Sequence, residues 1–311
     1  MTSVLDESYL TGMVDDISEF VRIPSRSSAE GGEEGPLQEL IASRMADLGA
    51  RVRTFEAADV PAFFSHPLCH GPERDYAGRP TVIGEVGPED APGLLVLAHS
   101  DTVQIASPQE WTFDPFSGEI RDGAVWGLGA ADDKWGLAAM LAMLRAIRDS
   151  GSTLRKRLIF ASTIDEEHGV GNGTLLLTLA GIRAESALYL DGYGLTVFIG
   201  NLGGSSLSLT PKSSTEKGLR LLHEKSIVET CERLSAERAD LFDRPYYREN
   251  WARERSFIFA PSADRFVIGF YTLPGESRQE MCEALETRLA EAPGGRSRTR
   301  PTSFRSCVAT F

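Results

Sequence analysis

The sequence predicts an α/β protein in which a mostly parallel sheet, with helices on both faces, is joined to a smaller α+β domain. In the first part of the chain, short apolar segments alternate with amphipathic helices, an order typical of a parallel sheet covered on both sides. After residue 200 the segments follow the order β-α-β-β-α, which favours a small α+β domain. We therefore expect one domain over residues 1–200 and a second over residues 201–311.

The first part of the chain is expected to form two helices, several strands and a hairpin. Apolar residues recur at every third or fourth position in two segments that end at Pro24 and Gly49, and this spacing predicts two helices. Short alternating or continuous apolar runs predict strands, and the pair Asp122-Gly123 marks a tight turn. The helices are expected from Leu10 to Val21 and from Leu37 to Met45, the strands at residues 51–57, 81–86 and 94–99, and the hairpin at residues 118–127.

The same criteria predict the remaining elements. A stretch between residues 57 and 81, which holds His66 and His70, has no period that predicts an element. In the first domain we expect a helix over residues 134–148 and buried strands over residues 158–164 and 186–191. In the second domain we expect strands over residues 197–210, 255–262 and 264–273 and helices over residues 226–241 and 277–292.

Composition excludes several classes of protein. The 311 residues are 41% hydrophobic and 25% charged, close to the average of globular proteins. The net charge of −13, from 32 Lys and Arg against 45 Asp and Glu, disfavours contact with phosphate backbones, so we expect no nucleic-acid partner. No apolar run approaches the roughly 20 residues that a membrane helix needs, and the first residues do not resemble a signal peptide. We therefore expect a cytoplasmic protein without a membrane partner.

The four cysteines predict neither a disulfide framework nor a zinc finger. Cys69, Cys231, Cys282 and Cys307 lie far apart and form no Cys-x-x-Cys pair. We expect four unpaired thiols in a reducing compartment.

Acidic residues gather where the predicted buried strands end. In open α/β sheets, functional sites lie at the carboxyl ends of the strands. One histidine with several carboxylates suits Zn²⁺, Co²⁺ or Mn²⁺ better than Mg²⁺, and a carboxylate that binds no metal can act as a general base. The residues in these positions are His99-Ser100-Asp101, Asp132-Asp133, Asp165-Glu166-Glu167-His168 and Asp191-Gly192.

The order and spacing of these motifs resemble a known enzyme family. The runs are HSDTV from residue 99, WTFDPFSGEIRDGAVWGLGAADDK from residue 111, TIDEEHGVG from residue 163 and LDG from residue 190. They are similar to the co-catalytic metallopeptidases and deacylases, a family that includes acetylornithine deacetylase, succinyl-diaminopimelate desuccinylase, carboxypeptidase G and the aminoacylases. The resemblance extends from the segment IPSRSS to about residue 194.

The resemblance implies a metal site with four ligands. His99 and Asp191 would bind the first metal ion, Asp132 would bridge both ions, and Glu167 would bind the second. The implied cofactor is zinc, as one or two ions, with cobalt or manganese as alternatives.

The resemblance also implies the chemistry and the partners. Glu166 would be the general base that activates a metal-bound water, and Asp101 would hold the ring of His99 through its other nitrogen. The implied reaction is hydrolysis of the amide bond of an N-acyl amino acid or small peptide. The resemblance also implies that residues 201–311 are a lid domain and that two chains form a homodimer through it. Asp133 and His168 match no ligand position, and we expect them to be exposed loop residues.

Two histidines of the family pattern have no match. In the family, the catalytic domain resumes after the lid and supplies a final histidine ligand, but no histidine follows His223 here. The lid segment that usually contains a histidine reads GNLGGSSLSLTPKSS, and His223 falls at the start of a predicted helix. The lid Asp-x-Arg element is also lost, since Phe270-Tyr271-Thr272 stands near its place.

These departures leave three interpretations open. The chain could be an active metallo-hydrolase with one tightly bound metal ion. It could be a catalytically degenerate or repurposed relative, such as a binding protein or a biosynthetic enzyme. It could also be a C-terminally shortened product, since the segment from Pro293 to Phe311 carries four arginines and no acid, a bias expected from out-of-frame translation of a GC-rich gene.

Overall fold

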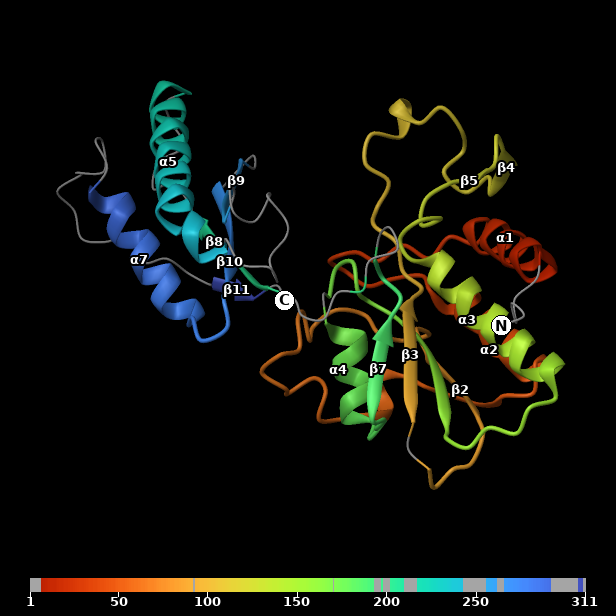
Figure 1. The fold of residues 1–311 in the computed structure, drawn as a ribbon. Coiled ribbons are helices and arrows are strands. Elements are labelled where there is room, and N and C mark those ends of the chain that lie inside the picture. Colours follow the sequence, from red (N-terminus) through yellow and green to blue (C-terminus); the bar gives the residue numbers. More distant parts are fainter. Residues whose placement is uncertain are drawn as a thin grey trace. The chain divides into compact units, whose positions relative to one another are not determined.

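The chain folds as two compact units, Met1–Val197 and Phe198–Phe311 (Figure 1). The computed structural model describes residues 7–91, 93–169, 171–192, 197, 202–209, 217–242, 256–261, 266–291 and 307–309. In this part of the chain, no helix is both long and apolar enough to span a membrane.

A five-stranded sheet forms the centre of unit 1. It contains β1 (Arg51–Phe55), β2 (Thr81–Val86), β6 (Leu158–Thr163), β3 (Leu94–His99) and β7 (Ser186–Tyr189), in that spatial order. The predicted α/β class is confirmed, but the sheet is mixed rather than mostly parallel. β3 runs parallel to β6 and β7, whereas β2 runs antiparallel to β1 and β6.

The mixed pairing follows from the position of β6 between β2 and β3. A short connection carries the chain from the end of β2 over the start of β6 to the start of β3. Gly93 lies close to Arg157, the residue before β6, and a Cβ atom at position 93 would be 2.1 Å from the carbonyl oxygen of Arg157. Only glycine permits this approach of two backbones.

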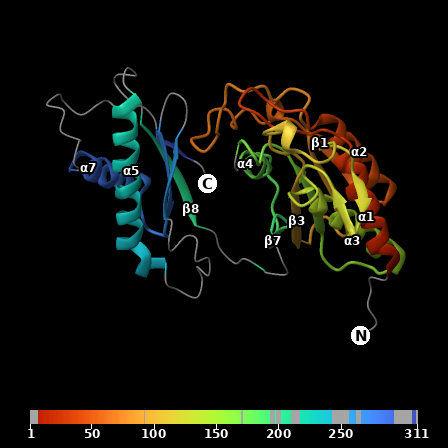
Figure 2. The same cartoon turned by 90° about the horizontal axis from the view of Figure 1, so that it is seen from above.

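Helices cover both faces of the sheet, as predicted. α1 (Glu7–Val21), α2 (Gly35–Asp47) and α3 (Lys134–Ser150) share one core with Val82, Val96 and Phe160. α4 (Asn172–Leu179) packs on the other face, where Leu177 meets Ile83, Leu97 and Ile159 (Figures 1 and 2). Because successive strand residues point to opposite faces, these apolar strands are buried on both sides.

Several details of unit 1 differ from the sequence prediction. The strand β7 was expected to be buried, but all four of its side chains are exposed, since it lies at one end of the strand order. The helix α4 was not predicted. The predicted hairpin is present as β4 (Glu119–Arg121) and β5 (Ala124–Trp126), and the Ser18 hydroxyl of α1 donates to the carbonyl oxygen of Gly118 at its start. Two 3₁₀ turns, η1 (Ala57–Asp59) and η2 (Pro108–Glu110), complete the unit.

Unit 2 is an antiparallel sheet packed against helices. The strand order is β11 (Cys307–Ala309), β8 (Gly203–Leu209), β10 (Phe266–Thr272) and β9 (Phe257–Pro261), and the helices are α5 (Lys217–Arg238), the 3₁₀ turn η3 (Ala239–Phe242) and α7 (Arg278–Glu291).

Alternate residues of β10 form the centre of the unit 2 core. Phe266, Ile268 and Phe270 are buried, and they share a cluster with Leu234 of α5 and Leu285 of α7. The predicted strands and helices are present, although α5 begins before the expected residue 226 and β11 was not predicted. Residues 293–306 and 310–311 of the arginine-rich tail lie outside the described residues. The role of this unit as a lid stays a prediction.

Candidate metal centre

His99 ends strand β3 and is completely buried. Its Nδ1 lies 2.9 Å from the backbone carbonyl oxygen of Asp101, which can only accept a hydrogen bond, so Nδ1 carries the hydrogen. Its Nε2 lies 2.9 Å from Oδ1 of Asp132 and 3.9 Å from Oε2 of Glu166. A nitrogen lone pair that faces carboxylate oxygens needs either a proton or a cation between them.

The pKa of His99 reflects this arrangement. Burial alone would lower the pKa, but hydrogen bonds to Asp101 and Asp132 and the nearby negative charges raise it well above its ordinary value. The ring is therefore placed where positive charge is stabilised.

Asp101 holds the turn that follows β6. Its carboxylate accepts hydrogen bonds from the backbone N–H groups of Glu166 and Glu167, each at 2.9 Å. The carboxylate is also 3.5 Å from Nδ1 of His99, so the contact to the ring is made mainly by the Asp101 carbonyl oxygen. Burial would raise the pKa of Asp101, but His99 and the two N–H groups lower it.

Glu166 and Glu167 extend from this turn toward His99. Burial is the main cause that raises the pKa of Glu166 to about 8; His99 opposes the rise, and the charges of Asp101 and Asp191 add to it. The pKa of Glu167 rises to about 7, again chiefly through burial, with the charge of Asp132 adding to the rise. Carboxyl groups with raised pKa values are those that a bound cation would stabilise in their ionised form.

Asp132 and Asp133 precede helix α3 and have different environments. The Asp132 side chain is 63% exposed, and its Oδ1 faces the ring of His99. The prediction that Asp133 is an exposed loop residue was wrong, because Asp133 is fully buried and its Oδ2 accepts the backbone N–H of His99 at 3.3 Å. Burial raises the pKa of Asp133 to about 7, and its Oδ1 has no hydrogen-bond partner. The expected exposure of His168 is confirmed.

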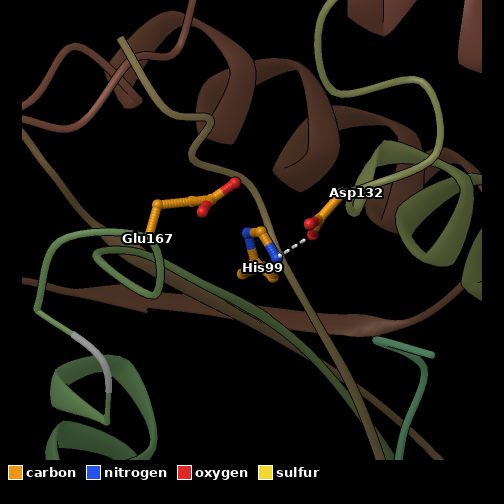
Figure 3. A group of neighbouring side chains, drawn as sticks. All are labelled: His99, Asp132 and Glu167. Atoms are coloured by element: carbon orange, nitrogen blue, oxygen red, sulfur yellow. Dashed lines mark hydrogen bonds and ion pairs between the residues drawn. The ribbon is translucent and has the colours of Figure 1, made fainter. Parts of the chain in front are cut away.

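The structure brings the four predicted metal ligands together in two overlapping groups. The ligand atoms of His99, Asp132 and Glu167 lie within 4.8 Å of one another, and so do those of His99, Glu166 and Asp191. Figure 3 shows the first group, in which Asp132 and Glu167 approach the His99 ring from different segments of the chain. One imidazole nitrogen and several carboxylate oxygens form a donor set that suits Zn²⁺, Co²⁺ or Mn²⁺. The residues present therefore fit a divalent metal ion.

Each of the two groups, drawn from the described residues, contains one histidine, which is His99. His223 lies within α5, and its side chain is outside the described residues.

Sequence reasoning missed a buried cluster of charges beside this site. Asp165 is fully buried and lies within hydrogen-bond distance of Arg74 and Arg79, and Arg79 also pairs with buried Glu34. The two arginines come from the stretch without periodicity between β1 and β2, so no pattern in the sequence indicated their burial. We name the set that surrounds Asp165 the Asp165 cluster; its members are Glu34, Arg74, Tyr76, Arg79, Asp165 and Asn172.

The comparison with protein families supports the resemblance. The model of peptidase family M20/M25/M40 matches residues 95–231, a segment that contains all the candidate ligands and Glu166. This segment is therefore similar to the family, and the predicted resemblance to metallopeptidases and deacylases is confirmed.

Curated proteins similar to this chain include a desuccinylase and a deformylase. A succinyl-diaminopimelate desuccinylase of Methylorubrum populi is 35% identical over 170 residues, which cover 53% of this chain and 38% of the relative. An N-formyl-4-amino-5-aminomethyl-2-methylpyrimidine deformylase of Bacillus subtilis is 34% identical over 119 residues, which cover 37% of this chain and 28% of the relative. The matches thus span less than two fifths of the length of these two relatives.

Solved structures show the same fold at low identity. Human carnosine dipeptidase 1 matches with a TM-score of 0.63 and 15% identity, and the match covers 92% of this chain and 75% of that one. A di-peptidase of Saccharomyces cerevisiae matches with a TM-score of 0.64 and 14% identity, over 92% of this chain and 74% of that one.

Proposed function

We propose that this chain is a metal-dependent hydrolase that cleaves the amide bond of an N-acyl amino acid or small peptide. The observation that carries the proposal is the convergence of His99 and four carboxylates, with Glu166 at the edge of the group. The named relatives support it, because the desuccinylase, the deformylase and the dipeptidases are hydrolases by name.

One or two metal ions would be held by side chains from four segments of unit 1. His99, Asp132, Glu167 and Asp191 are the ligands we propose, with zinc as the ion and cobalt or manganese as substitutes. When bound, such an ion polarises a substrate carbonyl and lowers the pKa of a water molecule.

Glu166 is the general base in this proposal. Its Oε2 lies 3.9 Å from Nε2 of His99, so the carboxylate reaches the space that the ligand atoms enclose. A carboxylate at this position can exchange a proton with a neighbouring water molecule. Burial raises the pKa of Glu166 in the metal-free protein, and the charge of a bound cation would oppose that rise. Glu166 would accept a proton from the attacking water at its carboxylate and donate it to the leaving amine.

Asp101 positions the two groups that do this chemistry. Its carbonyl oxygen accepts the hydrogen on Nδ1 of His99, so the lone pair of Nε2 faces the other proposed ligands. Its carboxylate accepts the backbone N–H groups of Glu166 and Glu167. A cytoplasmic location, a lid role for unit 2 and a homodimer through that unit belong to the same proposal. The non-hydrolytic alternative has no specific observation in its favour.

The proposal is tested by metal binding together with a substrate screen. The purified protein is treated with a chelator, reloaded with Zn²⁺, Co²⁺ or Mn²⁺, and assayed against N-succinyl, N-formyl and N-acetyl amino acids and dipeptides. We expect turnover that requires metal and that falls by about 10²- to 10⁴-fold in Glu166→Gln. Glu119→Gln in the hairpin is the control and should retain full activity. Metal-independent turnover, or full activity in Glu166→Gln, would refute the proposal.

A further inference from the structure

Asp165 immediately precedes the proposed base and is enclosed by hydrogen-bond donors. Its Oδ2 accepts from Nη1 of Arg74 at 2.7 Å, from Nδ2 of Asn172 at 2.7 Å and from the hydroxyl of Tyr76 at 3.3 Å. Its Oδ1 accepts from Nη2 of Arg79 at 3.1 Å. A carboxylate with partners on both oxygens has a fixed orientation, so the backbone that carries it is fixed as well.

A second buried carboxylate balances the charge of the cluster. Arg79 donates from Nε and Nη2 to the two oxygens of Glu34, at 2.7 and 2.6 Å, and both side chains are almost completely buried. Two arginines therefore face two carboxylates, Glu34 and Asp165. Removing one member would leave an unpaired charge in the interior, so the arrangement resists displacement.

The backbone at Asp165 needs such support. Asp165 has a φ of +61°, a conformation that residues other than glycine rarely adopt and that persists only where the surroundings enforce it. The backbone of Gly169 approaches the same carboxylate, and a Cβ atom there would lie 2.0 Å from Oδ2 of Asp165. Glycine at position 169 thus permits the carboxylate to occupy its place.

The turn is held from two sides. On one side the Asp101 carboxylate accepts the N–H groups of Glu166 and Glu167, and on the other side the Asp165 side chain is bound by the cluster. The carboxylates of Glu166 and Glu167 project from the backbone that Asp101 holds, directly after Asp165. Figure 3 shows the Glu167 side chain extending from this turn toward His99.

We propose that the Asp165 cluster positions the turn that presents Glu166 and Glu167 to the metal ion, and that Asp165, Arg74 and Arg79 are positioning residues. This inference rests on the proposed function, since it assigns the cluster a role only if a metal binds. None of the members of the cluster is a ligand in the groups around His99.

The test measures Co²⁺ binding by the metal-free protein, because Co²⁺ reports both affinity and ligand geometry through its visible absorption. In Asp165→Asn the side chain keeps its shape but loses its charge. We expect the Co²⁺ affinity to fall by about 10- to 100-fold and the visible spectrum to change, as for other groups that orient metal ligands.

The matched control is Asp16→Asn in helix α1. Asp16 is buried like Asp165 and forms a two-pronged ion pair with Arg145 of α3, at 2.5 and 3.0 Å. This variant loses a buried ion pair but touches no residue of the turn, so its Co²⁺ affinity should stay within about 2-fold of wild type. An equal loss in both variants would overturn the inference in favour of general destabilisation.

Further outcomes separate this inference from the proposed function. Wild-type affinity and an unchanged spectrum in folded Asp165→Asn would overturn the inference and leave the proposed function intact. If wild-type protein binds no Co²⁺, the proposed function fails, and the inference fails with it. If Asp165→Asn does not fold, the same measurement is made on Asn172→Ala. This variant removes one of the hydrogen bonds to Asp165, the 2.7 Å bond from Nδ2 of Asn172. That variant should lose about 10-fold in Co²⁺ affinity, and an unchanged affinity would overturn the inference.

Discussion

The two units differ in what they bury. Unit 1 encloses ionisable side chains close to the proposed metal ligands, whereas the core of unit 2, over its described residues, is built almost entirely from apolar side chains. Burial of a charge opposes folding unless the charge is paired. Most of the buried charges described in unit 1 lie in one region, although Asp16 is buried elsewhere. The buried ionisable residues of this region are Glu34, Arg74, Arg79, His99, Asp101, Asp133, Lys134 and Asp165.

Among the described residues, buried ionisable groups are concentrated in unit 1, where we propose the metal site. Unit 1 gives up part of its stability to hold carboxylates with raised pKa values. In unit 2 the buried charged residue among those described is Arg238, which is paired with Glu276. Substitutions in the two units should therefore have different effects. Changes at the proposed metal centre should alter metal binding, and changes in the unit 2 core should alter stability alone.

The largest effect is expected at His99. In His99→Ala, the shared nitrogen of both ligand groups is lost, so Zn²⁺ affinity measured by titration calorimetry should fall by more than about 100-fold, exceeding the loss expected for residues that only orient ligands. His168→Ala removes an exposed histidine of the neighbouring turn and should change the affinity by less than about 2-fold. Equal losses in the two variants would contradict the assignment.

A substitution in the core of unit 2 should lower stability and leave metal binding unchanged. Ile268 of β10 is completely buried, and Ile268→Ala should lower the free energy of unfolding of this unit by about 2–5 kcal/mol. Denaturation followed by circular dichroism measures the loss, and Zn²⁺ affinity should be unchanged. Val267→Ala, at the half-buried neighbouring position, should have a smaller effect. A fall in Zn²⁺ affinity in Ile268→Ala would show that the two units are energetically coupled.

The smallest expected effect is a pH dependence confined to unit 1. The pKa values of Glu166, Glu167 and Asp133 are raised to about 8, 7 and 7, so the folded metal-free protein binds more protons than the unfolded chain between about pH 5 and 8. The raised pKa of His99 acts in the same direction. The stabilisation from these protons is complete below the unfolded pKa values and is lost as the pH rises through the folded ones.

Scanning calorimetry with a chelator should show this effect as a fall in the Tm of unit 1 by a few degrees between pH 5 and 8, a size that corresponds to roughly 1–2 kcal/mol. Zn²⁺ should reverse the fall, because a cation favours the ionised carboxylates. The Glu166→Gln variant should show a weaker dependence. A Tm that rises with pH in the metal-free protein would be inconsistent with the raised pKa values.

The elements that the sequence predicted best are those whose signal is local. β2 and β3 lie at the expected residues because each is a short apolar run bounded by turn residues. The ligands were assigned through the resemblance of their motifs to the metallopeptidase and deacylase family. The structure also places all four predicted ligands in the two groups around His99. Their individual roles remain predictions.

The features that were missed depend on contacts between distant segments. An apolar run does not show the direction of its neighbours, so the insertion of β6 between β2 and β3 was not foreseen. Burial of Asp133 depends on the backbone of His99, and burial of Arg79 depends on Glu34 and Asp165. A charged residue in a loop is usually exposed, and only the assembled fold shows the exception.

The place of β6 in the sheet has a consequence for synthesis on the ribosome. β1 and β2 can pair as soon as both have emerged, but β3 pairs only with β6 and β7, which are translated much later. During that interval the apolar strand LLVLAH has no partner within the sheet, and such strands are prone to aggregate. The nascent chain is therefore most vulnerable between the emergence of residue 99 and that of residue 163, and chaperone demand should be highest in this window.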